Sequence, residues 1–103
     1  MEQEIKQILD KGKIIDELRK IIDPEIGHNI VDLGLIYEVG INNKNVRIIM
    51  TFTSPFCPAG EFLIDSIQSA IEHLGGKANI EVTFDPPWSA EKMQPDLRAA
   101  MNL

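Results

Sequence analysis

The stretch LGLIYEVGINNKNVRIIMTF, residues 33–52, alternates apolar and polar side chains on both sides of an asparagine-rich turn. Alternation with a period of two is typical of a strand with one buried face. Asparagine tolerates left-handed backbone dihedrals, so NNKN at 42–45 suits a hairpin turn. The stretch therefore predicts an antiparallel hairpin with strands over 30–41 and 46–53. Its expected inner face carries Leu33, Leu35, Tyr37, Val39 and Ile41, then Val46, Ile48, Met50 and Phe52.

Helical periodicity appears on both sides of this hairpin. Apolar residues at three- and four-residue steps predict a helix that is firm over 13–22, with residues 1–12 as a frayed helical extension. Pro24 ends it, because the residue before a proline avoids helical dihedrals. A second helix is predicted over 59–74 and stops at a pair of glycines. Its expected buried stripe is Phe62, Leu63, Ile67, Ala70, Ile71 and Leu74.

A third strand is predicted over 80–85, with Ile80, Val82 and Phe84 on one face, and DPPW closes it. A helical turn over 90–93 and a short helix over 95–101 follow. Because a strand–helix–strand unit favours a parallel crossover, the sheet should be mixed. We expect one domain over 1–103 of the α+β class, a two-layer sandwich with a three-stranded sheet and helices on one face.

The composition excludes some classes of partner. The net charge is −6, from 16 acidic and 10 basic side chains, so we expect no binding to nucleic acid. No apolar run approaches the roughly 20 residues that cross a bilayer, and residues 1–13 lack the apolar core of a secretion signal. With one cysteine the chain forms no internal disulfide. We therefore expect a cytoplasmic protein with no membrane partner.

The single cysteine lies in TSPFCPAGEF, residues 53–62, between Pro55 and Pro58 at the entrance of the second helix. Unpaired N–H groups and the helix dipole at such a position favour a thiolate and lower a cysteine pKa from ~8.5 by a unit or more. A thiolate binds soft metals or attacks electrophiles. The alternative is that Cys57 is a small buried hydrophobe.

Carboxylates and a histidine gather in DPEIGHNIVD, residues 23–32. Asp23 and Glu25 flank Pro24 at a helix end, where negative charge is disfavoured. They either stabilise their own loop or face a site. His28 is either a ligand or a solvated loop residue, and Asp32 begins the strand that follows.

Hydroxyl side chains precede the cysteine, and an aromatic segment follows the third strand. Thr51, Thr53 and Ser54 either bind a ligand or satisfy backbone groups at the strand end. Asp85 ends a strand, and Trp88 either plugs one end of the core or contacts a partner. These segments can meet with the DPE loop at one end of the sheet.

No motif supports a self-sufficient enzyme, because phosphate loops, H-E-x-x-H, C-x-x-C and G-x-S-x-G are all missing. One cysteine cannot hold a cluster alone, since iron–sulfur centres usually take four protein ligands. Further ligands would come from a second subunit, a carboxylate, His28 or a partner, and binding should then be labile.

Four motifs in order, DPEI at 23–26, NIVDLGLIY at 29–37, TSPFCP at 53–58 and DPPWS at 85–89, resemble the SufT/PaaD-like metal–sulfur cluster assembly family. The resemblance covers nearly the whole chain beyond about residue 13. Gly27 and His28 stand where many members carry proline after DPEI. The phenylacetate-oxygenase branch has further cysteines that are missing here, so the general assembly-factor branch is the better match.

The resemblance implies an iron–sulfur cluster assembly-type fold and a non-enzymatic role in maturing iron–sulfur proteins. Cys57 is then the metal or cluster ligand, with Asp23 and Glu25 as candidate additional ligands. His28, which departs from the family's pattern, is a further candidate ligand of this chain alone. Asp32, Thr51, Thr53, Ser54 and Pro55 would form the pocket. The implied cofactor is a labile iron–sulfur cluster, and the implied partners are the assembly machinery and apo-target proteins, with a homodimer as a further expectation.

Two other functions stay open on the residues alone. The first is a pure adaptor, in which Trp88 and the apolar face of the hairpin dock partners and Cys57 is only packed. Asp85 is a further candidate for a partner contact. The second is a thiol enzyme with Cys57 as nucleophile and His28 as base.

Overall fold

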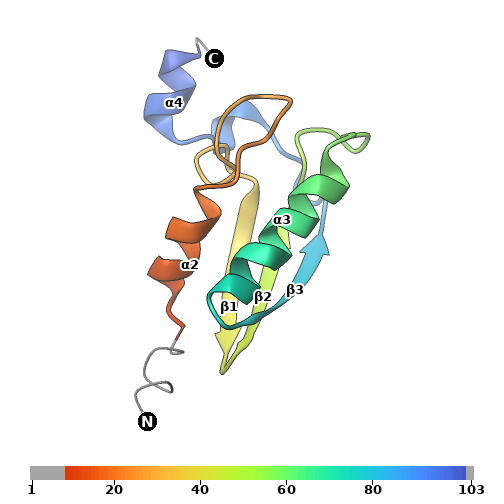
Figure 1. The fold of residues 1–103 in the computed structure, drawn as a ribbon. Coiled ribbons are helices and arrows are strands. Elements are labelled where there is room, and N and C mark those ends of the chain that lie inside the picture. The colour runs from red at the N-terminus through yellow and green to blue at the C-terminus, as the bar shows by residue number, and fades with distance from the viewer. Residues whose placement is uncertain (1–8, 102–103) are drawn as a thin grey trace.

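The computed structural model describes residues 9–101 and shows a three-stranded sheet covered on one face by two helices (Figure 1). The strand order is β1–β2–β3; β1 runs antiparallel to β2, and β2 runs parallel to β3. The mixed two-layer α+β fold expected from the sequence is therefore confirmed. The elements are α2 (Lys11–Leu18), β1 (Ile36–Asn42), β2 (Asn45–Met50), α3 (Gly60–His73), β3 (Lys77–Val82), η1 (Ala90–Lys92) and α4 (Pro95–Ala100).

The hairpin forms as predicted at its turn but not at its start. Asn43 has a φ of 60°, the left-handed conformation that a tight β1–β2 turn requires. In the sheet register Val39 lies opposite Ile48 and Ile41 lies opposite Val46. The first strand begins at Ile36 rather than at 30, because residues 29–35 close two tight turns. An irregularity between Ile36 and Glu38 also takes Tyr37 out of the buried row.

The core between sheet and helices is aliphatic. Its fully buried members come from both helices, from β2 and from the turns before β1. They are Ile14, Leu18, Ile30, Leu33, Leu35, Val46, Ile48, Met50, Leu63, Ile67 and Ile71. Over residues 9–101 the buried hydrophobic set contains no aromatic side chain.

The first helix is shorter than predicted. The Asp10 carboxylate accepts a hydrogen bond of 2.8 Å from the Lys13 N–H, so the helix begins at Lys11 and includes Gly12. After Leu18 the chain leaves the helix in tight turns and forms a bridge between Ile22 and Asn29. Residues 19–22 are therefore not helical, and Ile22 is 47% exposed. Of the predicted extension over residues 1–12, the first eight residues lie outside the described residues.

Two phenylalanine side chains that were predicted to be buried are exposed to solvent. Phe62 on α3 is 53% exposed, because the buried face of this helix carries Gly60, Leu63, Ile67 and Ile71 instead. Phe84 is 39% exposed, because β3 ends at Val82 and no longer fixes the alternation.

The segment after β3 is fastened to the turn before β1. The Trp88 indole N–H donates to the Leu33 carbonyl at 2.7 Å, and the Gln94 N–H donates to the Asp32 carbonyl at 2.7 Å. The Tyr37 hydroxyl donates to the Pro86 carbonyl at 2.8 Å. Within residues 9–101, each helix is too short or too polar to cross a bilayer.

Candidate functional site

Cys57 lies in the loop that leads from β2 to α3, three residues before the helix begins at Gly60. Its N–H donates to the Ser54 carbonyl at 3.2 Å, and its own carbonyl accepts from the Gly60 N–H at 3.2 Å. Two successive turns therefore hold the cysteine at the helix entrance but outside the helix. The side chain is half-buried.

The pKa of the Cys57 thiol is raised, so the predicted lowering is wrong. Partial burial of the sulfur is the largest cause, and the charges of Asp23 and Glu25 add to it. The Ala59 N–H, which hydrogen-bonds to the sulfur, opposes them. The helix entrance thus lowers the thiol pKa through one backbone N–H donor only. This effect is smaller than the rise caused by burial and by the two carboxylates.

Because the charges of Asp23 and Glu25 reach the sulfur, the DPE loop lies near the cysteine loop. Figure 1 places both loops at the end of the sheet where α3 begins. The sequence raised this meeting as one option, and the structure supports it.

Asp23 is the most unusual residue of the site, because it is a fully buried carboxylate. One oxygen, Oδ1, accepts the Glu25 N–H at 2.8 Å and stabilises the loop. The other, Oδ2, is buried without a hydrogen-bond partner. A buried carboxylate oxygen without a partner is unfavourable, so it marks a place where a cation would be stabilised.

The other candidate ligands differ from Asp23. Glu25 is exposed, and its charge reaches Cys57. His28 is half-buried, and its backbone carbonyl accepts the Asp23 N–H at 2.9 Å. Over residues 9–101 no three side chains of His, Cys, Asp or Glu lie together as a metal site. A metal at Cys57 would therefore need ligands from outside this part of the chain.

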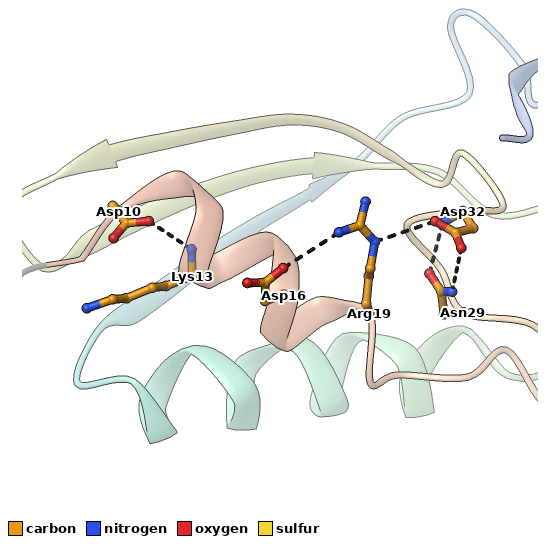
Figure 2. A network of polar contacts seen from close by, with 6 residues as sticks. All are labelled: Asp10, Lys13, Asp16, Arg19, Asn29 and Asp32. Carbon is orange, nitrogen blue, oxygen red and sulfur yellow. Dashed lines mark hydrogen bonds and ion pairs between the residues drawn. The ribbon is translucent and has the colours of Figure 1, made fainter.

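Asp32 has a structural role that the sequence did not reveal. Its carboxylate accepts from Asn29 Nδ2 at 3.0 Å and pairs with Arg19 Nε at 3.5 Å, while its N–H donates to Asn29 Oδ1 at 2.8 Å (Figure 2). These contacts fasten the loop to the end of α2. The role of Asp32 in the pocket stays a prediction.

The residues before the cysteine mainly support the backbone. Thr51 is fully buried, and its hydroxyl donates to the Phe52 carbonyl at 3.4 Å. Thr53 is half-buried. Ser54 and Pro55 are exposed, and Ser54 Oγ accepts the Phe56 N–H at 3.2 Å. Their role in a ligand pocket stays a prediction.

Trp88 and Asp85 differ in how far they are buried. Trp88 is half-buried against the core, which favours the plug over the partner contact. Asp85 is exposed, and its N–H donates to Thr83 Oγ1 at 3.2 Å. A partner contact through Asp85 stays a prediction.

Sequence patterns assigned no role to Phe56, which is 89% exposed next to Cys57. The available signal was its place in PFCP, where two prolines leave no helical or strand period that could bury it.

The raised pKa predicts slow alkylation of Cys57. At pH 7.5 iodoacetamide should modify it more slowly than free cysteine, because only the thiolate reacts. Glu25→Gln should accelerate the reaction, since it removes a negative charge that opposes ionisation. Mass spectrometry over time measures both rates. A Cys57 faster than free cysteine would support the thiol enzyme instead.

Comparison with known proteins places this geometry in a family. The model of the family described as "Iron-sulfur cluster assembly protein" matches residues 11–84. The chain belongs to this family. The matched range contains the DPE loop, the hairpin, Cys57 and α3, and it confirms the resemblance drawn from the sequence.

Individual members of the iron–sulfur cluster assembly family agree in sequence and fold. A protein of Porphyromonas gingivalis named Fe-S protein maturation auxiliary factor is 38% identical, over 81% of this chain and 82% of its own length. The maturation auxiliary factor SufT of Staphylococcus aureus is 34% identical, over 81% and 98%. The crystal structure of a domain of unknown function from Bacillus anthracis superposes with a TM-score of 0.84, at 32% identity over 90% and 92%.

Proposed function

We propose that this protein is a maturation factor for iron–sulfur proteins, which holds iron or a labile iron–sulfur cluster through Cys57 and passes it to apo-proteins. Its relatives are named auxiliary factors, which fits a carrier rather than an enzyme. The observation that carries the proposal is the buried, unpartnered Oδ2 of Asp23 in a loop whose charges act on Cys57.

The charges of this site suit a positively charged cargo. Asp23 and Glu25 oppose ionisation of the cysteine, so the free protein holds a neutral thiol. A ferrous ion or a cationic iron–sulfur core offsets the same two charges and gives Oδ2 a partner. The thiol releases its proton when its sulfur becomes a ligand.

The small number of ligands makes the cargo transferable. Thiolate sulfur is the usual ligand of iron in clusters, and a centre normally takes four ligands. With Cys57 and Asp23 from this chain, the other ligands come from small molecules or the recipient protein. Such a centre is held weakly enough for a recipient with more cysteines to remove it. We place this work in the cytoplasm, because the one cysteine is unpaired.

Anaerobic reconstitution with ferrous iron and sulfide tests the proposal. The wild-type protein should gain sulfur-to-iron charge-transfer absorption, and Cys57→Ser should lose it because the only thiol of the chain is gone. Asp23→Asn should retain several-fold less iron after desalting, because an uncharged amide NH2 replaces the Oδ2 oxygen. Absorption spectra and iron analysis measure both.

Asp96→Asn is the matched control, since Asp96 is an exposed carboxylate on the short helix α4, and it should behave as wild type. A wild-type protein without charge-transfer bands, or bands that Cys57→Ser retains, would overturn the proposal. That result would favour the adaptor function, in which Cys57 is only packed. Cys57→Ser should then still complement a deletion strain.

A further inference from the structure

All four phenylalanines of the chain gather around the start of α3, and none belongs to the buried core. Phe56 precedes Cys57, and Phe62 lies in the first turn of α3. A Cβ added to Gly60 would lie 3.0 Å from the Phe52 ring, so Phe52 packs on the helix start. The ring centroid of Phe84 is 6.1 Å from that of Phe52. We call these four residues the aromatic rim.

Three members of the rim are exposed to solvent, Phe56 by 89%, Phe62 by 53% and Phe84 by 39%. Single exposed hydrophobic residues are ordinary, but a cluster of large ones beside a candidate site is typical of an interaction surface. Aromatic side chains are also frequent among residues that dominate binding energy. Phe52 packs against the aliphatic core, whereas Phe56, Phe62 and Phe84 are exposed, so core packing does not explain their position at the Cys57 end.

The loop that carries Phe56 is held in one conformation before any partner arrives. Its N–H donates to Ser54 Oγ at 3.2 Å, and the Cys57 N–H donates to the Ser54 carbonyl at 3.2 Å. Pro55 and Pro58 fix two further backbone dihedrals. Because the backbone that carries Phe56 is already ordered, little backbone entropy is lost on binding, and Phe56 is suited to act as an anchor.

The surroundings of the rim are acidic. Segments 21–43 and 51–76 contain no lysine or arginine. They carry the exposed carboxylates Glu25, Glu61 and Asp65, and Asp65 shares a face of α3 with Phe62. Arg19 and Lys20, which precede the first segment, are already paired: Arg19 with Asp16 and Asp32, and Lys20 with Glu17. Lys44 and Lys77, which follow the two segments, lie at the hairpin end of the sheet, away from the rim. An approaching surface therefore meets exposed rings and negative charge.

We infer that the aromatic rim is a docking surface for a partner protein whose contact surface is apolar at its centre and bordered by lysine and arginine. Apolar contact accommodates the rings, basic side chains offset the carboxylates, and cations also stack on aromatic faces. A second copy of this chain is disfavoured, because it would place acidic residues against acidic residues. The inference deepens the proposed function, since docking at the rim brings a recipient to Cys57.

Binding of a designed probe tests the rim. The probe is a fluorescein-labelled amphipathic helical peptide with leucine on one face and lysine on the other, and its counterpart carries glutamate in place of lysine. The lysine peptide should bind the wild-type protein, more weakly as salt rises, and the glutamate peptide should not. The double variant Phe56→Ser/Phe62→Ser should weaken binding roughly tenfold or more. Fluorescence anisotropy measures each affinity.

Ile41→Ser is the matched control, because Ile41 is 37% exposed at the hairpin end of the sheet, away from the rim. It should leave the affinity unchanged. Equal binding by the rim variant and by wild type would overturn the inference, and so would a wild-type dimer in sedimentation that the rim variant abolishes. The rim variant should still gain charge-transfer absorption, so loss of docking and failure of iron binding are separate results.

Discussion

Gly34→Ala is expected to destabilise the fold by about 2–5 kcal/mol. Gly34 has a φ of +81°, where a residue with a Cβ loses roughly 1–2 kcal/mol. The added Cβ would also lie 2.1 Å from the Lys92 carbonyl oxygen and 2.6 Å from its carbon. Because both atoms belong to the backbone, the segment around η1 must move. Urea unfolding followed by circular dichroism measures the free energy of unfolding.

Gly27→Ala provides the matched control. Gly27 has a similar φ of +85°, but an added Cβ would have nothing within 4 Å. We expect a loss of only about 1–2 kcal/mol, from the backbone conformation alone. The difference between the two variants isolates the contact with Lys92. Equal losses of unfolding free energy in the two variants would show that the segment around η1 moves at no cost and does not stabilise the turn before β1.

This contact is one of several that fasten the C-terminal segment to the loop preceding β1. The Trp88 indole N–H and the Gln94 N–H donate to the carbonyls of the two residues before Gly34, those of Leu33 and Asp32. Lys92 also lies 5.3 Å from the centre of the Tyr37 ring. Gly34→Ala should therefore weaken the whole junction between residues 32–37 and 86–94.

Periodicity predicted the fold well where one side-chain pattern dominates. The hairpin around Asn43 and the helix α3 follow from alternation, turn chemistry and an i, i+3, i+4 stripe. The start of β1 could not be predicted, because the turns over 29–35 are set by the Asn29–Asp32 bonds and by contact with Lys92. Lys92 is distant in sequence, so no local pattern reveals its contact with this turn.

The site was predicted in part. Motif order indicated that Cys57 and the DPE loop belong together, and the charges of Asp23 and Glu25 do act on the sulfur. The direction in which the Cys57 pKa shifts could not be predicted, because it depends on how deeply the sulfur is buried and on how many N–H groups hydrogen-bond to it. The buried Oδ2 of Asp23 is likewise a property of the packed loop and not of DPE as a sequence.

Ile67→Ala and Phe62→Ala should have very different effects, although a helical stripe predicts both residues to be buried. Ile67 is fully buried in the core, so its truncation should lower the free energy of unfolding by about 2–5 kcal/mol. Phe62 is 53% exposed, so its truncation should change stability by less than about 1 kcal/mol. Both substitutions introduce alanine into the same helix, which keeps helix propensity comparable.

The comparison also decides what Phe62 is for. Phe62 lies five residues from Cys57, among carboxylates. If its large ring contributes little to stability, its function is to contact another molecule. If instead Phe62→Ala destabilises the protein as much as Ile67→Ala, the ring belongs to the packed interior. The aromatic rim would then lose one of its three exposed members, and loss of peptide binding by a variant of Phe62 would report unfolding rather than docking.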